Sequence, residues 1–372
     1  MDKKLQKILE KADVKINGGR PWDIQVNDKK VFRKVKLGGL TALGEAYVDG
    51  LWDCQQIDEL LERLIKADFS LAFKNHWATW GIFLKEKIFN LQKKSNVFKQ
   101  IRHHYDIGND LFELMLDKRM TYTCGYWKNA QNLDEAQEAK LDLVCQKIGL
   151  KPGMSVLDIG CGWGSFVKFA AEKYGAKCIG ITLSKNQAEY AKKSCRGLPV
   201  DIRIQDYRKV DEKFDRIISL GMFEHVGHKN YLEYMQSAHK NLKDGGMFLL
   251  HCFGGIYKTP NKRQSETRWV EKYIFPGMAL PSLGQIFTAT DNLFITHDLQ
   301  NFGKYYDPTL MAWFENFDKN WPEIKEKYGE KFYRLWKYYL LICAGGFRSG
   351  KYQLWQIVFS KKPIEKVYET VR

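Results

Sequence analysis

Residues 155–166 read SVLDIGCGWGSF, and this stretch decides the fold. An apolar run typical of a buried β-strand ends at Asp158, and a segment with helical character begins at Ser165. The loop between them contains Gly160, Cys161, Gly162 and Gly164. Glycines at such a turn let the backbone approach a ligand closely, and the following helix N-terminus points at that ligand. The stretch therefore predicts a ligand-binding loop at the edge of a sheet.

The spacing of this loop separates two kinds of ligand. A dinucleotide-binding loop has the pattern G-x-G-x-x-G, whereas Asp158 here begins the pattern D-x-G-x-G. That pattern resembles the S-adenosylmethionine loop of Rossmann-like methyltransferases. The resemblance implies a methyl donor and leaves the acceptor of the methyl group open.

The charge of the chain indicates an anionic partner. Its formal net charge is +15, and basic residues outnumber acidic ones within residues 1–36. Leu5, Ile8, Leu9 and Ala12 recur at helical spacing, which predicts a basic amphipathic helix. Such a helix suits a membrane interface, but packing against its own domain explains it equally well. No nucleic-acid partner is expected, because neither a base-flipping pocket nor an RNA-binding module is recognisable.

Composition places the chain in the cytoplasm. No apolar run approaches the length of a membrane span, and the charged N-terminus lacks the apolar core of an export signal. The eight cysteines have no paired spacing, which favours free thiols in a reducing compartment. No metal site is expected, because His225 and His228 lie three residues apart in a loop rather than four apart on a helix.

Residues 1–100 form a separate N-terminal domain, which is expected to be mainly helical. Residues 24–26 and 31–32 flank Asn27 and Asp28, a pattern that predicts a short hairpin. A wide apolar stripe runs through residues 73–91. The stripe fits a protein core, a dimer seam or a lipid-facing surface, so the domain is expected to bind lipid or to mediate dimerisation.

Residues 101–372 alternate between strand and helix patterns, which predicts an α/β domain with a mostly parallel, seven-stranded sheet. Strands are expected at residues 155–159, 177–182, 200–205, 214–220, 247–252, 293–298 and 352–360. Helices are expected at residues 165–174, 185–195 and 229–242, the last stopped by Asp244-Gly245-Gly246. Residues 254–292 and 309–346 exceed a minimal domain of this kind, and we expect such insertions after the fifth strand to form a lid.

Further candidate ligand-binding residues follow the expected strands. Thr182 and Gln187 can bind ribose hydroxyls in place of the usual acidic residue, and Ser184 is a typical N-cap. After the third strand, Gln205, Asp206 and Tyr207 offer polar groups and an aromatic face for an adenine ring.

Two residues at the carboxyl edge of the sheet can carry acid–base chemistry. Glu224 follows the fourth strand and His251 ends the fifth. Ligands bind at this edge in such folds. A carboxylate facing a buried pocket there is a candidate proton acceptor, although a lone histidine at a strand end is more often only hydrogen-bonded.

An ordered set of motifs makes the resemblance specific. They are YDIGNDLF at 105–112, YTCGYW at 122–127, DIGCGWG at 158–164, GMFEHVG at 221–227, YYD at 305–307, CAGGFR at 343–348 and QLWQ at 353–356. Together they resemble the cyclopropane-fatty-acyl-phospholipid synthases, relatives of the mycolic acid cyclopropane synthases, over essentially the whole chain.

This resemblance implies transfer of a methylene group from S-adenosylmethionine to a cis double bond in the acyl chain of a membrane phospholipid, closing a cyclopropane ring. The alternative is an acyl-lipid methyltransferase whose product is branched and has no ring. The implied donor-binding residues are Tyr122, Thr123, Asp158, Gly160, Cys161, Gly162, Gly164, Thr182, Leu183, Gln187, Gln205, Asp206 and Tyr207.

The resemblance also implies that a bound bicarbonate ion serves as general base. Its cradle would consist of Cys124, Glu224, His251, Tyr306 and the backbone of Phe253. Cys343 matches a family cysteine sometimes regarded as catalytic, but no covalent thiol step is needed and a structural role fits it better. The family further implies a homodimer that associates peripherally with the inner face of the membrane.

Overall fold

The computed structural model describes residues 3–69, 108–256 and 267–372. The chain divides into two units. Unit 1 contains Met1–Leu91, Asn261–Pro276 and Tyr306–Tyr352, and unit 2 contains Gln92–Pro260, Gly277–Tyr305 and Gln353–Arg372. No helix within the described residues is apolar over a length that could cross a bilayer.

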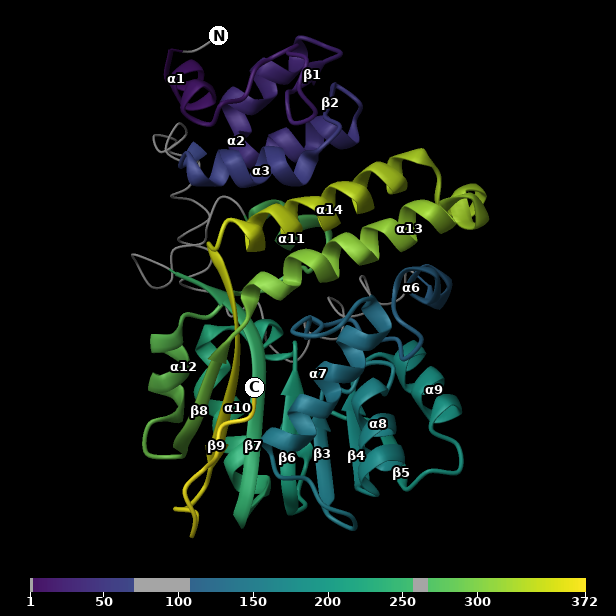
Figure 1. Ribbon diagram of the computed structural model, residues 1–372, viewed down its shortest axis with the longest axis vertical. Helices are drawn as coiled ribbons and strands as arrows, with labels where there is room; N and C mark the ends of the chain where they lie inside the picture. The colour runs from purple at the N-terminus through teal and green to yellow at the C-terminus, as the bar shows by residue number, and fades with distance from the viewer. Residues whose placement is uncertain (1–2, 70–107, 257–266) are drawn as a thin grey trace. The chain divides into compact units, whose positions relative to one another are not determined.

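Unit 2 is built on a seven-stranded sheet with the order β5-β4-β3-β6-β7-β9-β8 (Figure 1). The strands are β3 (Ser155–Ile159), β4 (Lys177–Thr182), β5 (Val200–Ile204), β6 (Phe214–Leu220), β7 (Leu242–Gly255), β8 (Ile295–Asn301) and β9 (Tyr352–Ser360). Strands β5, β4, β3, β6 and β7 pair in parallel, and β8 pairs with β9 in antiparallel orientation. The predicted sheet, mostly parallel and seven-stranded, is confirmed.

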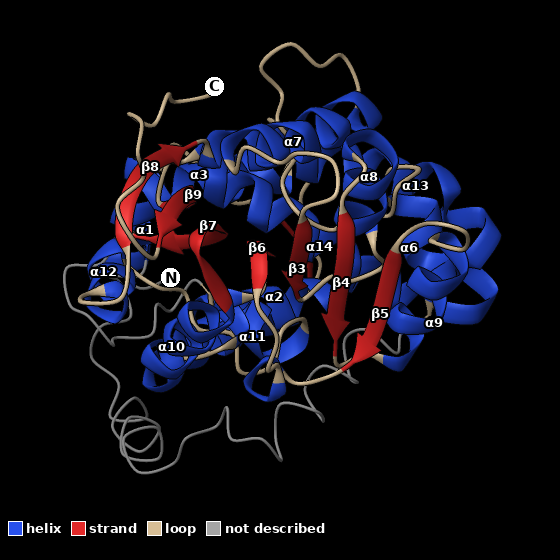
Figure 2. Ribbon diagram, turned by 90° about the horizontal axis from the view of Figure 1, so that it is seen from below, coloured by secondary structure: helices blue, strands red, loops and turns tan. Residues whose placement is uncertain are grey.

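Helices cover both faces of this sheet, which explains the continuous apolar runs of its strands (Figure 2). Within β3, Val156 belongs to one core, and Leu157 and Ile159 belong to the other. The helices of unit 2 are α6 (Asn109–Met115), α7 (Leu133–Lys147), α8 (Ser165–Tyr174), α9 (Lys185–Ser194), α10 (Tyr231–Asn241) and α12 (Leu283–Thr290). Residues of α7, α8 and α9 contribute to the first core, and residues of α10 and α12 contribute to the second.

Local sequence signals set the starts of several helices. The Ser184 hydroxyl accepts a hydrogen bond from Gln187 N at 3.3 Å, which confirms the predicted N-cap of α9. Asn132 caps α7 through Glu135 N, and Ser282 forms a capping box with Gln285 at the start of α12.

The fifth strand is longer than the sequence predicts. Strand β7 begins at Leu242, directly after α10 ends at Asn241, so Asp244–Gly246 are part of the strand rather than a stop before it. The pairing with β6 is irregular between Phe214 and Arg216. A β-bulge accommodates extra residues in this way without ending the strand.

Unit 1 is mainly helical in its described part. Its elements are α1 (Lys3–Lys11), β1 (Gln25–Val26), α2 (Lys30–Val48), β2 (Trp52–Asp53), α3 (Ile57–Lys66), α11 (Arg268–Tyr273), α13 (Tyr306–Tyr328) and α14 (Glu330–Arg348). Leu9 and Ala12 of the amphipathic N-terminal segment are buried in this unit. Gly345 lets α14 approach α3 closely, since a Cβ at this position would lie 2.2 Å from Asp58 O.

The predicted hairpin at residues 24–32 is wrong. Strand β1 pairs instead with β2, and Val31 lies in α2. Val31 and Val35 are both buried, one helical turn apart. This i, i+4 spacing buries one helix face, and it overrides the local turn signal of Asn27 and Asp28.

The expected domain break after residue 100 and the apolar stripe of residues 73–91 lie outside the described residues. The helices α13 and α14 pack against each other within unit 1, and α14 also packs against α2 and α3. Much of the expected lid insertion therefore belongs to the same unit as the N-terminal helices.

Candidate active site

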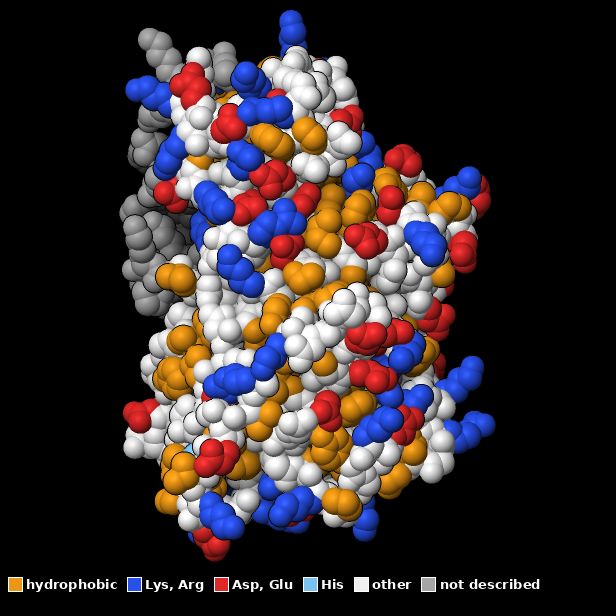
Figure 3. Space-filling model, viewed as in Figure 1, with side chains coloured by type: hydrophobic (Ala, Val, Ile, Leu, Met, Phe, Trp, Pro, Cys, Tyr) orange, Lys and Arg blue, Asp and Glu red, His pale blue; other side chains and the backbone are white. Residues whose placement is uncertain are grey.

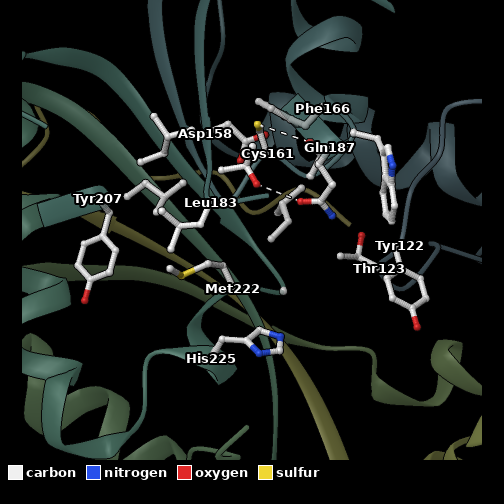
Figure 4. Close-up of a pocket in the computed structure, with 18 of the residues that line it drawn as sticks. Tyr122, Thr123, Asp158, Cys161, Phe166, Leu183, Gln187, Tyr207, Met222 and His225 are labelled. Atoms are coloured by element: carbon white, nitrogen blue, oxygen red, sulfur yellow. Dashed lines mark hydrogen bonds between the residues drawn. The ribbon is translucent and has the colours of Figure 1, made fainter. Parts of the chain in front are cut away.

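A pocket with a volume of about 150 Å³ lies in unit 2, where β3, β4, β5 and β6 end (Figure 4). The structure brings together here all but one of the predicted donor-binding residues. These are Tyr122, Thr123, Asp158, Gly160, Cys161, Gly162, Thr182, Leu183, Gln187, Gln205, Asp206 and Tyr207. Gly164 is the exception: it lies at the N-cap of α8, with a left-handed φ of 86°.

The glycine loop forms the base of this pocket. Gly160 and Gly162 have φ values of 91° and 53°, a region that other residues rarely adopt. The N–H groups of Gly160 and Cys161 both donate to Ile181 O at 3.0 Å, which ties the loop to β4. A Cβ at Gly160 would lie 2.8 Å from the side chain of Met222. Glycine is therefore required here both by the backbone and by the available space.

Thr182, at the end of β4, and Gln187 line the pocket and are hydrogen-bonded to each other. The Thr182 hydroxyl donates to Gln187 Oε1 at 3.0 Å, and it accepts from Ser184 N at 3.2 Å. This bond fixes the orientation of the Gln187 amide, whose nitrogen is the end turned away from Thr182 (Figure 4). The arrangement provides a hydrogen-bond donor at a fixed position in the pocket.

Asp206 and Tyr207, which follow β5, also line the pocket. The Asp206 carboxylate accepts from Arg208 at 2.9 and 2.6 Å, so the arginine holds it in place. The Tyr207 ring packs edge-to-face on Tyr234, with the ring centroids 4.9 Å apart. Asp206 is consequently a rigid acceptor at the end of β5.

Sequence reasoning missed part of the lining. The missed residues are Met120, Thr121, Ile159, Trp163, Ser165, Phe166, Ile181, Arg208, Leu220, Gly221, Met222, His225, Val226 and Asn230. Six of them lie within the recognised motifs at 158–164 and 221–227 but were not assigned to the donor. Most of the others are apolar or lie beside a motif, so only their proximity to it could have indicated them. Trp163 is held by a bond from its Nε1 to Asn109 Oδ1 at 2.9 Å. His225 also lines the pocket, and desolvation lowers its pKa to about 4, which leaves the ring neutral.

Glu224 lies next to the pocket lining and is fully buried. Its Oε1 accepts from Phe253 N at 2.6 Å, and its Oε2 has no hydrogen-bond partner among the described residues. Burial raises the pKa of Glu224 to about 8. The side chain can therefore exchange a proton near neutral pH.

His251, two residues before Phe253 on β7, is also buried. The Gln356 amide on β9 lies 3.3 Å from His251 Nδ1, and His251 Nε2 has no partner within the described part of the chain. Burial holds the pKa of His251 well below its usual range, so the ring is neutral. If the amide nitrogen donates to Nδ1, the ring proton lies on Nε2 and forms an unused donor.

The six predicted catalytic residues are divided between the two units. Cys124, Glu224, His251 and Phe253 lie in unit 2, whereas Tyr306 and Cys343 lie in unit 1. The Cys124 thiol is buried, 3.3 Å from Gly125 O. Tyr306 begins α13 and stacks on Phe347 at a centroid distance of 4.4 Å. Desolvation raises the pKa of Cys343 to about 12, which keeps its thiol protonated.

Solved structures of similar proteins identify the class. The cyclopropane synthase MmaA2 from Mycobacterium tuberculosis superposes with a TM-score of 0.68 and 33% identity, covering 71% of this chain and 98% of its own. The mycolic acid cyclopropane synthase CmaA1, in complex with SAH and CTAB, has a TM-score of 0.67 and 34% identity with the same coverage. Together with the sheet and its glycine loop, these similarities define the chain as a Rossmann-like, S-adenosylmethionine-dependent methyltransferase.

Sequence comparison identifies the family. Residues 92–357 match the family model described as mycolic acid cyclopropane synthetase. The cyclopropane-fatty-acyl-phospholipid synthase of Escherichia coli (strain K12) is 45% identical over 95% of this chain and 92% of its own length. The chain belongs to this family of cyclopropane synthases, as its motifs predict.

Proposed function

We propose that this enzyme transfers a methylene group from S-adenosylmethionine to the cis double bond of an unsaturated acyl chain in membrane phospholipid and closes a cyclopropane ring. The observation that carries the proposal concerns two buried polar atoms beside the pocket, Glu224 Oε2 and His251 Nε2, which have no hydrogen-bond partner among the residues that the structure describes. Buried polar atoms are rarely left unpaired unless they serve a ligand or a reaction. Similarity to the E. coli synthase supports the same reaction.

The pocket is proposed to hold the methyl donor. The glycine loop would let the donor approach the backbone, while Gln187 and Asp206 would bind its polar groups. Tyr122 and Trp163 pack with Phe112 at the pocket wall, with ring centroids 5.2 and 4.7 Å from the Phe112 ring. Such aromatic walls exclude water and stabilise positive charge.

The reaction needs both an ordered donor and a proton acceptor. An alkene is a poor nucleophile, so the sulfonium methyl must lie in line with it. The alkene carbon bonds to the methyl group as the sulfur–carbon bond breaks, which leaves a carbocation on the acyl chain. A proton then leaves the new methyl group, and the electrons of that bond close the ring. Exclusion of water prevents capture of the cation.

The residues around Glu224 fit a bicarbonate ion. Neutral His251 can donate from Nε2, and Glu224 Oε2 can accept a hydrogen bond from the hydroxyl of the ion when the carboxyl group is ionised. The remaining proposed contacts come from Cys124, Tyr306 and the Phe253 backbone, although Phe253 N–H donates to Glu224 Oε1 in this structure. When bound, bicarbonate supplies a base for the proton of the methyl group. Glu224 and His251 would hold it and set its orientation.

Unit 1 is proposed to serve the lipid side of the reaction, through peripheral membrane binding, dimerisation or both. The net charge of +15 favours an anionic surface. On the face seen in Figure 3, basic side chains over α1 to α3 alternate with acidic ones rather than forming one basic patch. Arg20, Lys34 and Arg63 are each paired with a carboxylate. Membrane attraction is therefore expected to be modest and salt-sensitive. The helices α13 and α14 are proposed to cover the acyl chain.

The test is incubation of the full chain with S-adenosylmethionine and vesicles of unsaturated phospholipid, followed by mass spectrometry of the acyl chains. The expected product has gained one methylene group and resists hydrogenation. Vesicles of saturated phospholipid are the control and should give no product. A product that gains the same mass but is branched and not cyclic would favour the methyltransferase alternative. Methyl transfer to RNA, with none to lipid, would contradict the proposal.

A further inference from the structure

Lys140 is a buried cation to which the proposed reaction gives no role. It lies in the middle of α7, and its exposed fraction is 0%. Burying an ammonium group costs free energy unless hydrogen bonds or opposite charges compensate. The contacts of Lys140 therefore indicate why the fold retains a charge at this position.

The first contact is with the wall of the pocket. Lys140 Nζ donates to Thr123 Oγ1 at 2.8 Å, and Gln137, one turn earlier on α7, donates from Nε2 to Thr123 O at 2.7 Å. Tyr126 N donates to Ala136 O at 2.8 Å. Since Thr123 lines the pocket, α7 holds this part of the wall at three points.

The second contact is electrostatic. Asp117, Cys124 and Asp158 face Lys140 and favour its charge, while burial lowers its pKa to about 8. Burial likewise raises the pKa of Asp158 to about 8, and the charge of Lys140 opposes that rise. Each residue thus stabilises the charged form of the other. Protonation of His251 is disfavoured by burial and by both Lys140 and Lys147, so this effect does not distinguish the two lysines.

We infer that Lys140 is a positioning residue: it holds Thr123 in the pocket wall, so that the methyl donor binds in a fixed place beside Glu224 and His251. The inference rests on the proposed function, because that function assigns the pocket to the donor. It adds a residue that is neither in the recognised motifs nor in the pocket lining.

Lys147 provides a matched control on the same helix. It is also buried, with 1% exposure, but its Nζ donates to Gln300 Oε1 at 2.6 Å and lies 3.3 Å from Asp298 Oδ2. Both partners belong to β8, and neither lines the pocket. Removing either lysine deletes a buried charge, but only Lys140 contacts the pocket wall.

The experiment compares Lys140→Met and Lys147→Met by titration calorimetry with S-adenosylhomocysteine and by thermal unfolding. Lys140→Met should weaken S-adenosylhomocysteine binding by about tenfold, because a charge-assisted hydrogen bond is lost. Lys147→Met should lower the unfolding temperature and leave the dissociation constant unchanged. Lys140→Arg should recover part of the affinity. In a Thr123→Val background, Lys140→Met should have a smaller effect, since the bonded hydroxyl is already absent.

Equal effects of the two lysine variants on affinity would overturn the inference, since Lys140 would then be merely structural. If Lys140→Met does not fold, the Thr123→Val variant provides the test. Weaker binding of S-adenosylhomocysteine by this variant supports the inference, and unchanged binding overturns it. Failure of the unmodified chain to bind S-adenosylhomocysteine would instead contradict the proposed function.

Discussion

The pocket differs in construction from the two proposed acid–base residues beside it, Glu224 and His251. The pocket is formed by backbone turns and short motifs at the ends of four neighbouring strands. Glu224 and His251 are single buried side chains, and their protonation depends on burial and on partners distant in sequence, such as Gln356. Under the proposed function, the pocket should bind the methyl donor without Glu224 and His251, whereas these two residues should act only once the donor is bound.

This difference separates binding from chemistry. Changes in the pocket should act first on donor affinity. Changes at Glu224, His251 or Gln356 should act on turnover and its pH dependence, with donor affinity preserved. The two regions can therefore be distinguished by measuring both quantities in the same variants.

The largest effect is expected for Glu224→Gln. The amide cannot ionise, so it would no longer offer a charged acceptor to the hydroxyl of the proposed bicarbonate base. Turnover should therefore fall about 100-fold or more, in the range typical of lost acid–base catalysis. The dissociation constant of S-adenosylhomocysteine should change less than about twofold, because Glu224 does not line the pocket. Steady-state kinetics and calorimetry measure the two quantities. If turnover and the affinity for S-adenosylhomocysteine fell by the same factor, Glu224 would contribute to donor binding, and the separation of binding from chemistry would be wrong.

The next effect is expected for Gly160→Ala. The added Cβ would lie 2.8 Å from Met222 on a backbone with φ of 91°, so donor affinity should fall about tenfold or more. Gly197→Ala is the control, since Gly197 also has a positive φ of 82° but open space around it. It should lower stability and leave S-adenosylhomocysteine binding unchanged. Equal binding losses would mean that backbone strain alone, and not the shape of the pocket, is responsible.

A smaller effect is expected for Gln356→Leu. Without the amide, neither tautomer of His251 is favoured by a partner at Nδ1, so turnover should fall about tenfold while donor affinity is kept. Gln353→Leu, on the same strand, removes an amide that bonds Asn301 instead of His251. It should retain turnover. Unchanged turnover in Gln356→Leu would show that Gln356 does not set the tautomer of His251 that the reaction needs.

The smallest effect concerns stability as a function of pH. The folded-state pKa of Glu224 is about 8, against 4.5 for the ordinary group. Its contribution to stability is therefore complete below about pH 4.5 and is lost as the pH rises through about 8. Relative to the unmodified chain, Glu224→Gln should gain thermal stability steadily between pH 5 and pH 8. A difference in unfolding temperature that does not vary with pH would show that Glu224 is ionised when folded.

Much of the fold could be predicted because its signals are local. Strand β3 and the helix α8 have the predicted bounds, since an apolar run, a glycine turn and an amphipathic segment follow one another directly. The hairpin at residues 24–32 failed because Val31 and Val35 are buried as a helix face, and their burial depends on residues far along the chain. The packing of α13 and α14 within unit 1 is likewise a long-range property without a local signal.

In the candidate site, too, residues with a local sequence signal could be predicted, and residues whose role depends on distant contacts could not. The proposed donor-binding residues could be predicted to line one pocket because they occupy recognisable strand ends. Lys140 and Gln137 could not be predicted, because a buried lysine or glutamine in a helix resembles a surface residue until its neighbours are known. Gln356 lies in the motif at 353–356, but the motif does not indicate its contact with His251. The sequence also cannot show the protonation states of Asp158 and Glu224, which burial determines.

The most direct test of the account uses S-adenosylmethionine with a fully deuterated methyl group, the unmodified chain and vesicles of cis-unsaturated phospholipid. Mass spectrometry of the acyl chains counts the deuterons that are kept. Ring closure requires the loss of one deuteron from the transferred methyl group, so the account predicts a CD2 ring carbon in a product that resists hydrogenation. A branched product that retains the whole CD3 group would contradict it.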